Sequence, residues 1–252
     1  MAYRRGGHLI VKSKLFSLAC HMTFYSLWPI AWFLNFVLYR MTAKGRWKIK
    51  ELRKKHKNAI VVSNHCTFLD PILMCLTVMP LSIYHTLLEA TVCVPFLGTF
   101  IQLLGGMPVP SGRNVKQRFL DGIQDALKRR PFVHIYPEGE CYIQNQEVTK
   151  FHQGAFLASM ELNIPIIPVA TVLTEPKTIL GWKSVRPRAT EYVLDPIFPD
   201  KFTSAREFAE YTHQAIQAEI YRRNGTNAYS KGHLERLDII AKQEKIAATH
   251  GN

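Results

Sequence analysis

The sequence predicts one α/β domain preceded by a membrane-associating segment. A chain of 252 residues suits a single sizeable domain with a buried core. An uncharged apolar stretch occupies residues 15–39, and short apolar runs alternate with helical stretches after residue 57. We therefore divide the chain into residues 1–57, a membrane-associating helical segment with a basic linker, and residues 58–252, the folded domain.

The apolar stretch predicts a helical segment embedded in a membrane. Residues 15–39 contain no Lys, Arg, Asp or Glu, and Lys14 and Arg40 flank them. The length suits one transmembrane helix of about 20 residues and is too great for a cleavable signal peptide. Because Pro29 divides it into two pieces of roughly a dozen residues, a kinked span and a helix pair dipping into one leaflet both stay open.

A strongly basic run follows the apolar stretch. Residues 40–57 contain nine Lys or Arg and one acid, Glu51. Each cation near an anionic leaflet contributes up to about 1 kcal/mol to membrane binding. We therefore expect an anionic membrane surface as a partner, with the functional domain on the cytoplasmic side.

Each later element is predicted from its own pattern. Runs of five to seven mostly apolar, often β-branched residues predict strands. The predicted strands are 59–63, 82–88, 132–136, 165–170 and 190–194. The predicted helices begin at Pro71 and also cover 95–104, 115–129, 154–162, 204–222 and 234–246. This alternation is typical of a sheet flanked by helices.

Composition narrows the function classes. The net charge of +13 calls for an anionic partner, but no zinc knuckle, basic zipper or aromatic RNP pattern accompanies it, which argues against nucleic-acid binding. The five cysteines form no C-x-x-C pair and indicate reduced thiols. The ten histidines form no H-E-x-x-H motif. We therefore predict neither a metal site nor a cofactor.

One group of polar residues near predicted strand ends suggests a catalytic site. In VVSNHCTFLDP, His65 follows the carboxyl end of a predicted strand, where α/β folds bind ligands, and Asp70 precedes Pro71. A tight turn would bring Asp70 back to the imidazole, although Asp70 could equally serve as a helix cap. The segment YPEGE at 136–140 follows another predicted strand and is expected at the same sheet edge.

The blocks NHCTFLD, YPEGE and IPIIPV, in this order, resemble the glycerolipid acyltransferase family that includes 1-acylglycerol-3-phosphate acyltransferases. The resemblance covers residues 58–170 and implies a mixed central sheet flanked by helices, as in glycerol-3-phosphate acyltransferases. It also implies that His65 is the general base and Asp70 its orienting partner. The chemistry agrees, since a positioned imidazole that takes the proton of an alcohol accelerates acyl transfer by ~10²- to 10⁴-fold.

The same resemblance gives Glu138 a part in positioning the acceptor, and the backbone N–H near Gly139 is a candidate donor to the oxyanion. The competing interpretation of P-E-G is an ordinary turn. Pro165 and Pro168 are expected to shape a wall of the cleft. Because no G-x-S-x-G motif occurs, we predict direct attack by the acceptor in a ternary complex.

The sequence departs from the family where phosphate-binding cations are expected. Polar or thiol residues occupy those places, and Glu140 replaces a threonine. The replacing residues are Ser111, Cys141 and His152. Nearby cations that could bind the phosphate instead are Arg113, Lys116 and Lys150, of which we favour Arg113 and Lys150.

The resemblance therefore implies a membrane-associated acyltransferase of phospholipid biosynthesis. It would move an acyl chain from acyl-CoA or acyl carrier protein to a lysophospholipid, with 1-acyl-sn-glycerol-3-phosphate as the leading acceptor and phosphatidic acid as the product. A lysolipid with a zwitterionic or amino-acid-containing headgroup is an alternative acceptor. A catalytically silent membrane-binding protein is an alternative of another class.

Overall fold

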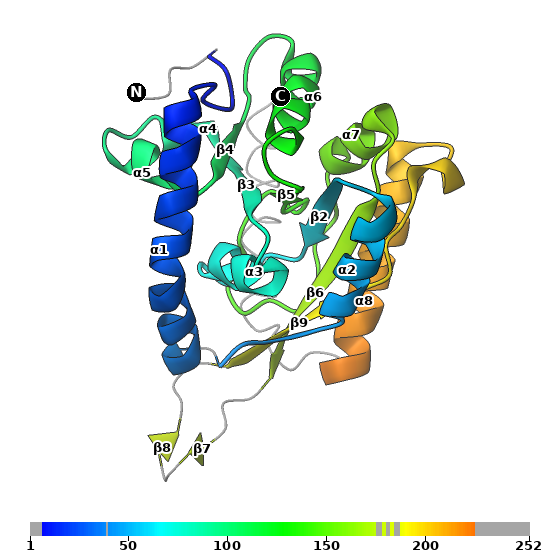
Figure 1. The fold of residues 1–252 in the computed structure, drawn as a ribbon. Helices are drawn as coiled ribbons and strands as arrows, with labels where there is room; N and C mark the ends of the chain where they lie inside the picture. Colours follow the sequence, from blue (N-terminus) through cyan, green and yellow to red (C-terminus); the bar gives the residue numbers. More distant parts are fainter. Residues whose placement is uncertain (1–6, 39, 175–177, 180–181, 184–186, 225–252) are drawn as a thin grey trace, which may run out of the picture.

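The computed structural model describes residues 7–38, 40–174, 178–179, 182–183 and 187–224 (Figure 1). Within them, a seven-stranded sheet has the order β1-β9-β6-β2-β5-β3-β4. Its strands are β1 (Thr42–Lys44), β2 (Ala59–Ser63), β3 (Ile83–Leu88), β4 (Gly106–Val109), β5 (Phe132–Ile135), β6 (Ile166–Thr174) and β9 (Arg188–Val193). Two short strands, β7 (Thr178–Ile179) and β8 (Trp182–Lys183), pair separately.

Helices cover both faces of the sheet. On one face, Ile60 and Val62 of β2 pack into an apolar core with α6, α7 and α8. On the other face, Ala59 and Val61 pack against α2 and α3. The helices are α1 (Lys14–Leu38), α2 (Arg46–Lys55), α3 (Asp70–Val78), α4 (Glu89–Val92), α5 (Leu97–Leu103), α6 (Val115–Leu127), α7 (Gly154–Leu162) and α8 (Ala205–Asn224), with a 3₁₀ turn η1 (Pro199–Lys201).

Strand direction brings the ends of several strands to one edge. β2 runs parallel to β5 and β6, β5 runs parallel to β3, and β3 runs parallel to β4. β9 is antiparallel to β6, which confirms the predicted mixed sheet. The carboxyl ends of β2, β5, β3 and β4 therefore meet at the same edge, the usual position of a ligand site in such sheets.

The apolar N-terminal stretch forms one helix. α1 continues through Pro29 as a single helix and packs against α3 and α5 (Figure 1). The predicted helix pair is therefore wrong. Contacts in the first half of α1 hold it against the body: Cys20 and Phe24 are buried, and the Tyr25 hydroxyl donates to the Pro80 carbonyl at 2.9 Å.

None of the helices in the described ranges is both long and apolar enough to cross a membrane. The apolar run of α1 is interrupted by polar residues such as His21 and Asn35, which lower its mean hydropathy.

The basic linker contributes to the domain. Its first part forms β1, which pairs with β9. Its second part forms α2, where Ile49 and Leu52 are buried against the sheet and most of the Lys and Arg residues of the helix are exposed. Neither element was predicted, and β4 was missed as well. The helix predicted at 234–246 lies outside the described residues.

Candidate active site

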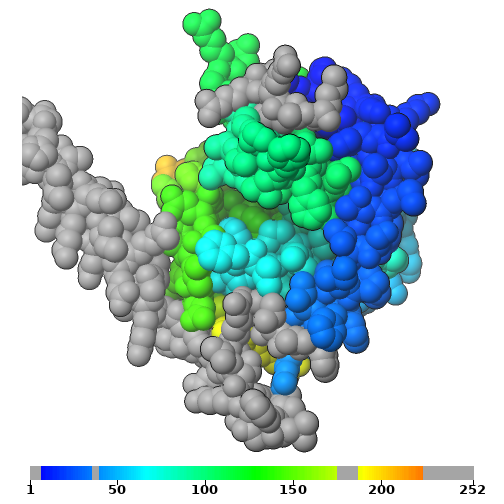
Figure 2. Space-filling model, turned by 90° about the vertical axis from the view of Figure 1, so that its left-hand side faces the viewer, coloured from blue at the N-terminus to red at the C-terminus, as the bar shows by residue number. Residues whose placement is uncertain are grey.

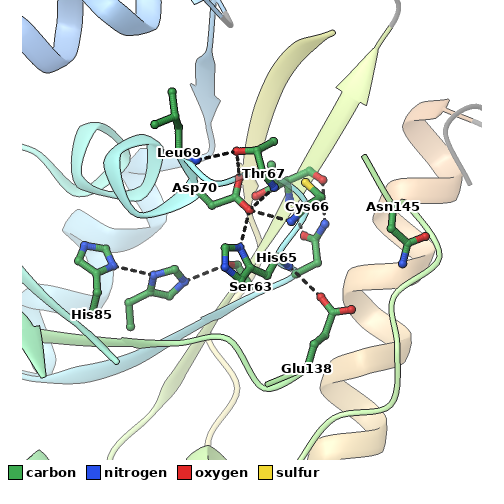
Figure 3. A network of polar contacts seen from close by, with 12 residues as sticks. Ser63, His65, Cys66, Thr67, Leu69, Asp70, His85, Glu138 and Asn145 are labelled. Atoms are coloured by element: carbon green, nitrogen blue, oxygen red, sulfur yellow. Dashed lines mark hydrogen bonds and ion pairs between the residues drawn. The ribbon is translucent and has the colours of Figure 1, made fainter. Parts of the chain in front are cut away.

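His65 and Asp70 meet where β2 ends and α3 begins (Figure 3). His65 Nδ1 lies 2.9 Å from Asp70 Oδ2. Because a carboxylate can only accept, Nδ1 carries the proton and Nε2 is left as the basic nitrogen. The His65 side chain is 18% exposed and that of Asp70 only 1%, so the imidazole is reachable while its partner is enclosed.

The loop before α3 wraps around the Asp70 carboxylate. Oδ2 also accepts the backbone N–H groups of Cys66 at 2.7 Å and Thr67 at 2.8 Å. Oδ1 accepts the Thr67 hydroxyl at 2.7 Å. Asp70 occupies the first turn of α3, yet the hydrogen bonds of its side chain in the described part of the chain go to His65, Cys66 and Thr67, which precede the helix. The predicted alternative, a helix cap, is therefore wrong, and the carboxylate is held rigidly at His65.

Glu138 holds the backbone of His65. Its Oε1 accepts the His65 N–H at 2.8 Å, and its Oε2 accepts both the N–H and the hydroxyl of Thr149, at 2.9 and 2.8 Å. The side chain is buried, and burial raises its pKa while these hydrogen bonds oppose the rise. Since both oxygens already accept protein donors, these contacts make Glu138 a positioning residue for His65. The acceptor-binding role predicted from the sequence has no counterpart in them.

Gly139 closes a turn. Its N–H donates to the Tyr136 carbonyl at 3.1 Å, so this particular amide is engaged within the turn. A donor to the oxyanion near Gly139 stays a prediction. Gly139 has a φ of +77°, and a Cβ there would lie 3.1 Å from the His152 ring. Glycine is needed both for the left-handed backbone and for the space.

An aromatic stack backs the imidazole. The His65 and Tyr136 rings are stacked with centroids 3.9 Å apart, and His134 meets the tyrosine edge-on with centroids 4.3 Å apart. The Tyr136 hydroxyl is buried and has no hydrogen-bond partner among the residues that the structure describes. Burial, and then the nearby Asp70 and Glu191, raise the pKa of Tyr136 well above its ordinary value. The phenol is therefore neutral and fixes the imidazole through ring contact.

A buried polar chain extends from this stack beneath α3 (Figure 3). The Ser63 hydroxyl lies 2.8 Å from His134 Nε2, and His134 Nδ1 lies 3.0 Å from His85 Nδ1. His85 Nε2 lies 3.1 Å from the Cys75 sulfur. Burial lowers the pKa of His134 strongly and that of His85 to about 3, so both imidazoles stay neutral. We did not predict these residues, although each histidine interrupts an apolar strand.

Glu191 completes the polar layer on β9. It is buried opposite Thr171 of β6, and one of its oxygens accepts the Thr77 hydroxyl of α3. Burial raises its pKa to about 8, the Thr77 hydrogen bond opposes this, and Asp70 adds to it. Glu191 is thus a neutral acid near pH 7.

The predicted phosphate-binding cations lie on separate loops. Arg113 is exposed in the turn between β4 and α6, and Lys150 is exposed next to Thr149. In the described ranges, neither side chain makes a hydrogen bond or ion pair with His65 or Asp70. Ser111, at a place where the family pattern has a cation, donates to Glu89. The assignment of Arg113 and Lys150 to the acceptor stays a prediction.

A hollow opens at this edge. Figure 2 shows it between the teal α4–α5 segment and the cyan segment at the start of α3, with α1 in blue beside it. The cyan segment includes the loop that carries His65. The site is therefore a partly open cleft with one reachable imidazole.

Comparison with known proteins places this site in a family context. The sequence profile of the Acyltransferase family matches residues 44–172, which is about half of the chain and includes His65, Asp70 and Glu138. The 1-acyl-sn-glycerol-3-phosphate acyltransferase of Saccharomyces cerevisiae is 30% identical over 164 residues, which are 61% of this chain and 52% of that protein. An uncharacterised acyltransferase of Schizosaccharomyces pombe is 28% identical over 183 residues, 69% and 63% of the two chains.

These matches span between half and two thirds of the length of the curated relatives. Among solved structures, the fold is similar to that of the 1-acyl-sn-glycerophosphate acyltransferase PlsC of Thermotoga maritima. The TM-score is 0.54 at 18% identity, over 83% of this chain and 78% of that one.

Proposed function

The chain belongs to the Acyltransferase family, and on that premise we propose that it transfers a fatty acyl chain from a thioester, acyl-CoA or acyl carrier protein, to the hydroxyl of a lysophospholipid. The leading acceptor is 1-acyl-sn-glycerol-3-phosphate, with phosphatidic acid as the product. One observation carries the proposal: His65 Nδ1 is fixed on Asp70 at 2.9 Å, which leaves a basic nitrogen on a partly exposed ring.

The proposed reaction uses these two residues directly. His65 Nε2 takes the proton of the acceptor hydroxyl while the oxygen attacks the thioester carbonyl. Asp70 stabilises the imidazolium that forms and keeps the ring in the required tautomer. The tetrahedral intermediate collapses as the C–S bond breaks, and the imidazolium returns the proton to the leaving thiolate. No cofactor besides the thioester donor enters this sequence.

The acceptor headgroup is the less constrained part of the proposal. A phosphate in a partly desolvated cleft needs cationic donors, each contributing about 1.5–3 kcal/mol, and Arg113 and Lys150 are our candidates. Glu140, an exposed carboxylate in the turn that follows Glu138, would repel a phosphate and favour an ammonium group. A zwitterionic lysolipid is therefore the second candidate acceptor.

We also propose that residues 1–57 attach the domain to a membrane, with the site on the cytoplasmic side. α1 supports this because one of its sides packs on the body while large apolar residues on the other side are exposed, among them Leu15, Met22 and Phe33. The basic residues of the linker would add salt-sensitive attraction to anionic lipid. Recovery of the full-length protein in the soluble fraction at low salt, without detergent, would contradict this attachment.

A direct assay tests the reaction. Detergent-solubilised protein is incubated with labelled acyl-CoA or acyl carrier protein and a panel of lysolipids that includes 1-acyl-sn-glycerol-3-phosphate and zwitterionic acceptors. We expect acyl transfer with at least one pair, and a loss of at least ~10²-fold in His65→Ala at an unchanged melting temperature. A catalytically silent protein would show no transfer above background, and activity of His65→Ala within about threefold of wild type would refute the assigned base.

A further inference from the structure

The phenol ring of Tyr136 covers one face of the catalytic imidazole. Tyr136 directly follows β5, and its ring is tilted by only 16° from that of His65, with centroids 3.9 Å apart. Pairs of neutral aromatic rings usually have centroids about 4.5–7 Å apart, either offset or edge to face. The imidazole of His65 therefore lies closely over the face of the phenol ring rather than beside it.

This geometry suits a charged imidazole better than a neutral one. An aromatic ring carries negative charge density on its faces and positive charge density at its edge. Two neutral rings stacked face to face bring regions of like charge together, whereas a cation within about 6 Å of the ring centre is attracted to the face. The stack therefore favours the imidazolium form of His65 over its neutral form.

The phenol ring is held in this position from behind. His134 meets Tyr136 edge-on, with an interplanar angle of 63° and centroids 4.3 Å apart. The two ring nitrogens of His134 contact the Ser63 hydroxyl at 2.8 Å and His85 Nδ1 at 3.0 Å. Because His134 is fixed at both nitrogens, the face that Tyr136 presents to His65 is fixed as well.

The enclosure of His65 calls for such an interaction. Its side chain is only 18% exposed, and a cation that is removed from water loses hydration free energy. Asp70 meets the imidazole in the plane of the ring, at Nδ1. Tyr136 meets it across the face, a direction that the carboxylate does not cover.

The positive charge on His65 exists only between two proton transfers of the proposed reaction. It appears when Nε2 takes the proton of the acceptor hydroxyl, as the hydroxyl oxygen bonds to the thioester carbonyl carbon. It disappears when the C–S bond breaks and that proton passes to the thiolate. An interaction that is stronger with the charged ring lowers the barrier between these two events.

We propose that Tyr136 stabilises the imidazolium form of His65 through the face of its ring and so accelerates acyl transfer. The hydroxyl of Tyr136 has no part in this effect. The inference deepens the proposed function and rests on it for the rate of acyl transfer, whereas the effect on protonation of His65 requires no substrate.

Fluorinated rings test the charge effect at nearly constant shape. Tyr136→Phe is the reference, and the same position then receives mono-, di- and pentafluorinated phenylalanine. Fluorine withdraws electron density from the ring face, and the pentafluorinated ring has a positive face. We expect kcat to fall at each step, by about tenfold in total (about 1.4 kcal/mol), at similar melting temperatures. If the pentafluorinated variant does not fold, the first two steps decide.

Protonation of His65 is measured separately, by an NMR titration without substrate. The His65 signal is assigned by its loss in His65→Ala. We expect the titration midpoint to fall by up to about one pH unit from Tyr136→Phe to the pentafluorinated variant. The acid limb of the pH profile of kcat should move to lower pH with it.

Other titratable groups surround the stack, and fluorination leaves all of them in place. Burial keeps His134 uncharged, and it keeps Glu191 uncharged near pH 7. The groups that lie near the two rings are Cys66, Asp70 and Cys75 on and before α3, His134 and Glu138 on and after β5, and Glu191 on β9. A shift that follows the degree of fluorination therefore reports on the ring of Tyr136.

Phe202 provides the matched control. Its ring stacks on Phe208 with centroids 4.4 Å apart and an interplanar angle of 8°, in the apolar core on the other face of the sheet. Pentafluorinated phenylalanine at this position should leave both kcat and the titration of His65 as in wild type.

Two results would overturn the inference. Values of kcat and titration midpoints that stay constant through the series would reduce the stack to a packing contact. A fall in kcat with an unchanged midpoint would mean that Tyr136 only orients the imidazole. If wild type acylates no acceptor, the proposed function fails, but the titration still decides whether the ring stabilises the imidazolium.

Discussion

The two faces of the sheet differ in what they bury. The face under α6, α7 and α8 is lined by apolar residues such as Ile60 and Val62. The face under α2 and α3 begins with apolar residues but becomes polar toward the carboxyl edge. Its buried polar residues are Ser63, His85, His134, Thr171 and Glu191.

This difference indicates which face serves the chemistry. Buried polar groups cost free energy unless they are hydrogen-bonded, so a layer of them beneath α3 needs a compensating role. The layer lies directly behind His65 and Asp70 and contacts them through the Tyr136 stack. One face of the sheet therefore supplies packing stability, and the other holds a catalytic pair in place. Each prediction below challenges that division.

The largest effect is expected from Asp70→Asn. In asparagine only one of the two side-chain atoms can accept the hydrogen bonds that His65, Cys66 and Thr67 donate to the carboxylate. The neutral amide also stabilises an imidazolium poorly. We expect kcat to fall at least ~10²-fold, somewhat less than in His65→Ala, with little change in KM. Steady-state kinetics measure this. Activity within threefold of wild type, in a variant that melts normally, would remove the pair from the mechanism.

The opposite face is tested by Ile60→Ala. Ile60 is fully buried in β2, and truncation leaves a cavity worth about 2–5 kcal/mol of unfolding free energy. The folded fraction should keep the wild-type kcat. Urea denaturation and assays below the transition measure the two quantities. The matched variant Ser63→Ala, on the other face of the same strand, should destabilise less and lower kcat. Equal kcat in both variants would refute the division of the faces.

A smaller effect is expected from Glu138→Gln. In glutamine an NH₂ group replaces one of the two carboxylate oxygens, and this group cannot accept a hydrogen bond. The variant therefore loses either the two hydrogen bonds from Thr149 or the one from the His65 N–H. The His65 loop then loosens, so kcat should fall about tenfold, or about 1.4 kcal/mol in the barrier, with KM for the acceptor unchanged. A rise in KM at constant kcat would instead restore the acceptor-binding role that the sequence suggested.

Much of this architecture could be predicted, for identifiable reasons. The strand at 59–63 and the helix at 154–162 have strong local patterns, and the structure has them at the predicted bounds. β1 and α2 were missed because lysine-rich composition suggested a solvated linker, while two buried residues, Ile49 and Leu52, decide the packing. The contact between His65 and Asp70 was predicted from the family resemblance, because the spacing alone also allowed Asp70 to cap the helix.

Contacts between distant segments could not be predicted. Glu138 reaches the backbone of His65 across two loops. This contact does not follow from local pattern. His85 and His134 carried a usable signal, because each places a polar residue inside an apolar strand. Their register in β3 and β5, which puts them side by side, depends on tertiary pairing.

Glu191 allows the most delicate test of the polar face. Thr77 and Asp70 of α3, Thr171 of β6 and Tyr136 after β5 are the polar groups associated with it. Burial is the main cause that raises its pKa from 4.5 to about 8. Between these two pH values the unfolded chain has released the proton and the folded chain retains it. The folded state then binds more protons, so the free energy of unfolding falls as pH rises through this window.

Glu191→Gln should remove that dependence, because glutamine is neutral at every pH and its carbonyl can still accept the Thr77 hydroxyl. The melting temperature of the variant relative to wild type should therefore rise from pH 4.5 to about 8 and level off above. Scanning calorimetry across this range measures the difference. Glu210→Gln, which removes an exposed carboxylate of α8, is the matched control and should give a flat difference. A flat difference for Glu191→Gln as well would mean that Glu191 is ionised in the folded protein, and the layer behind His65 would then hold a buried charge.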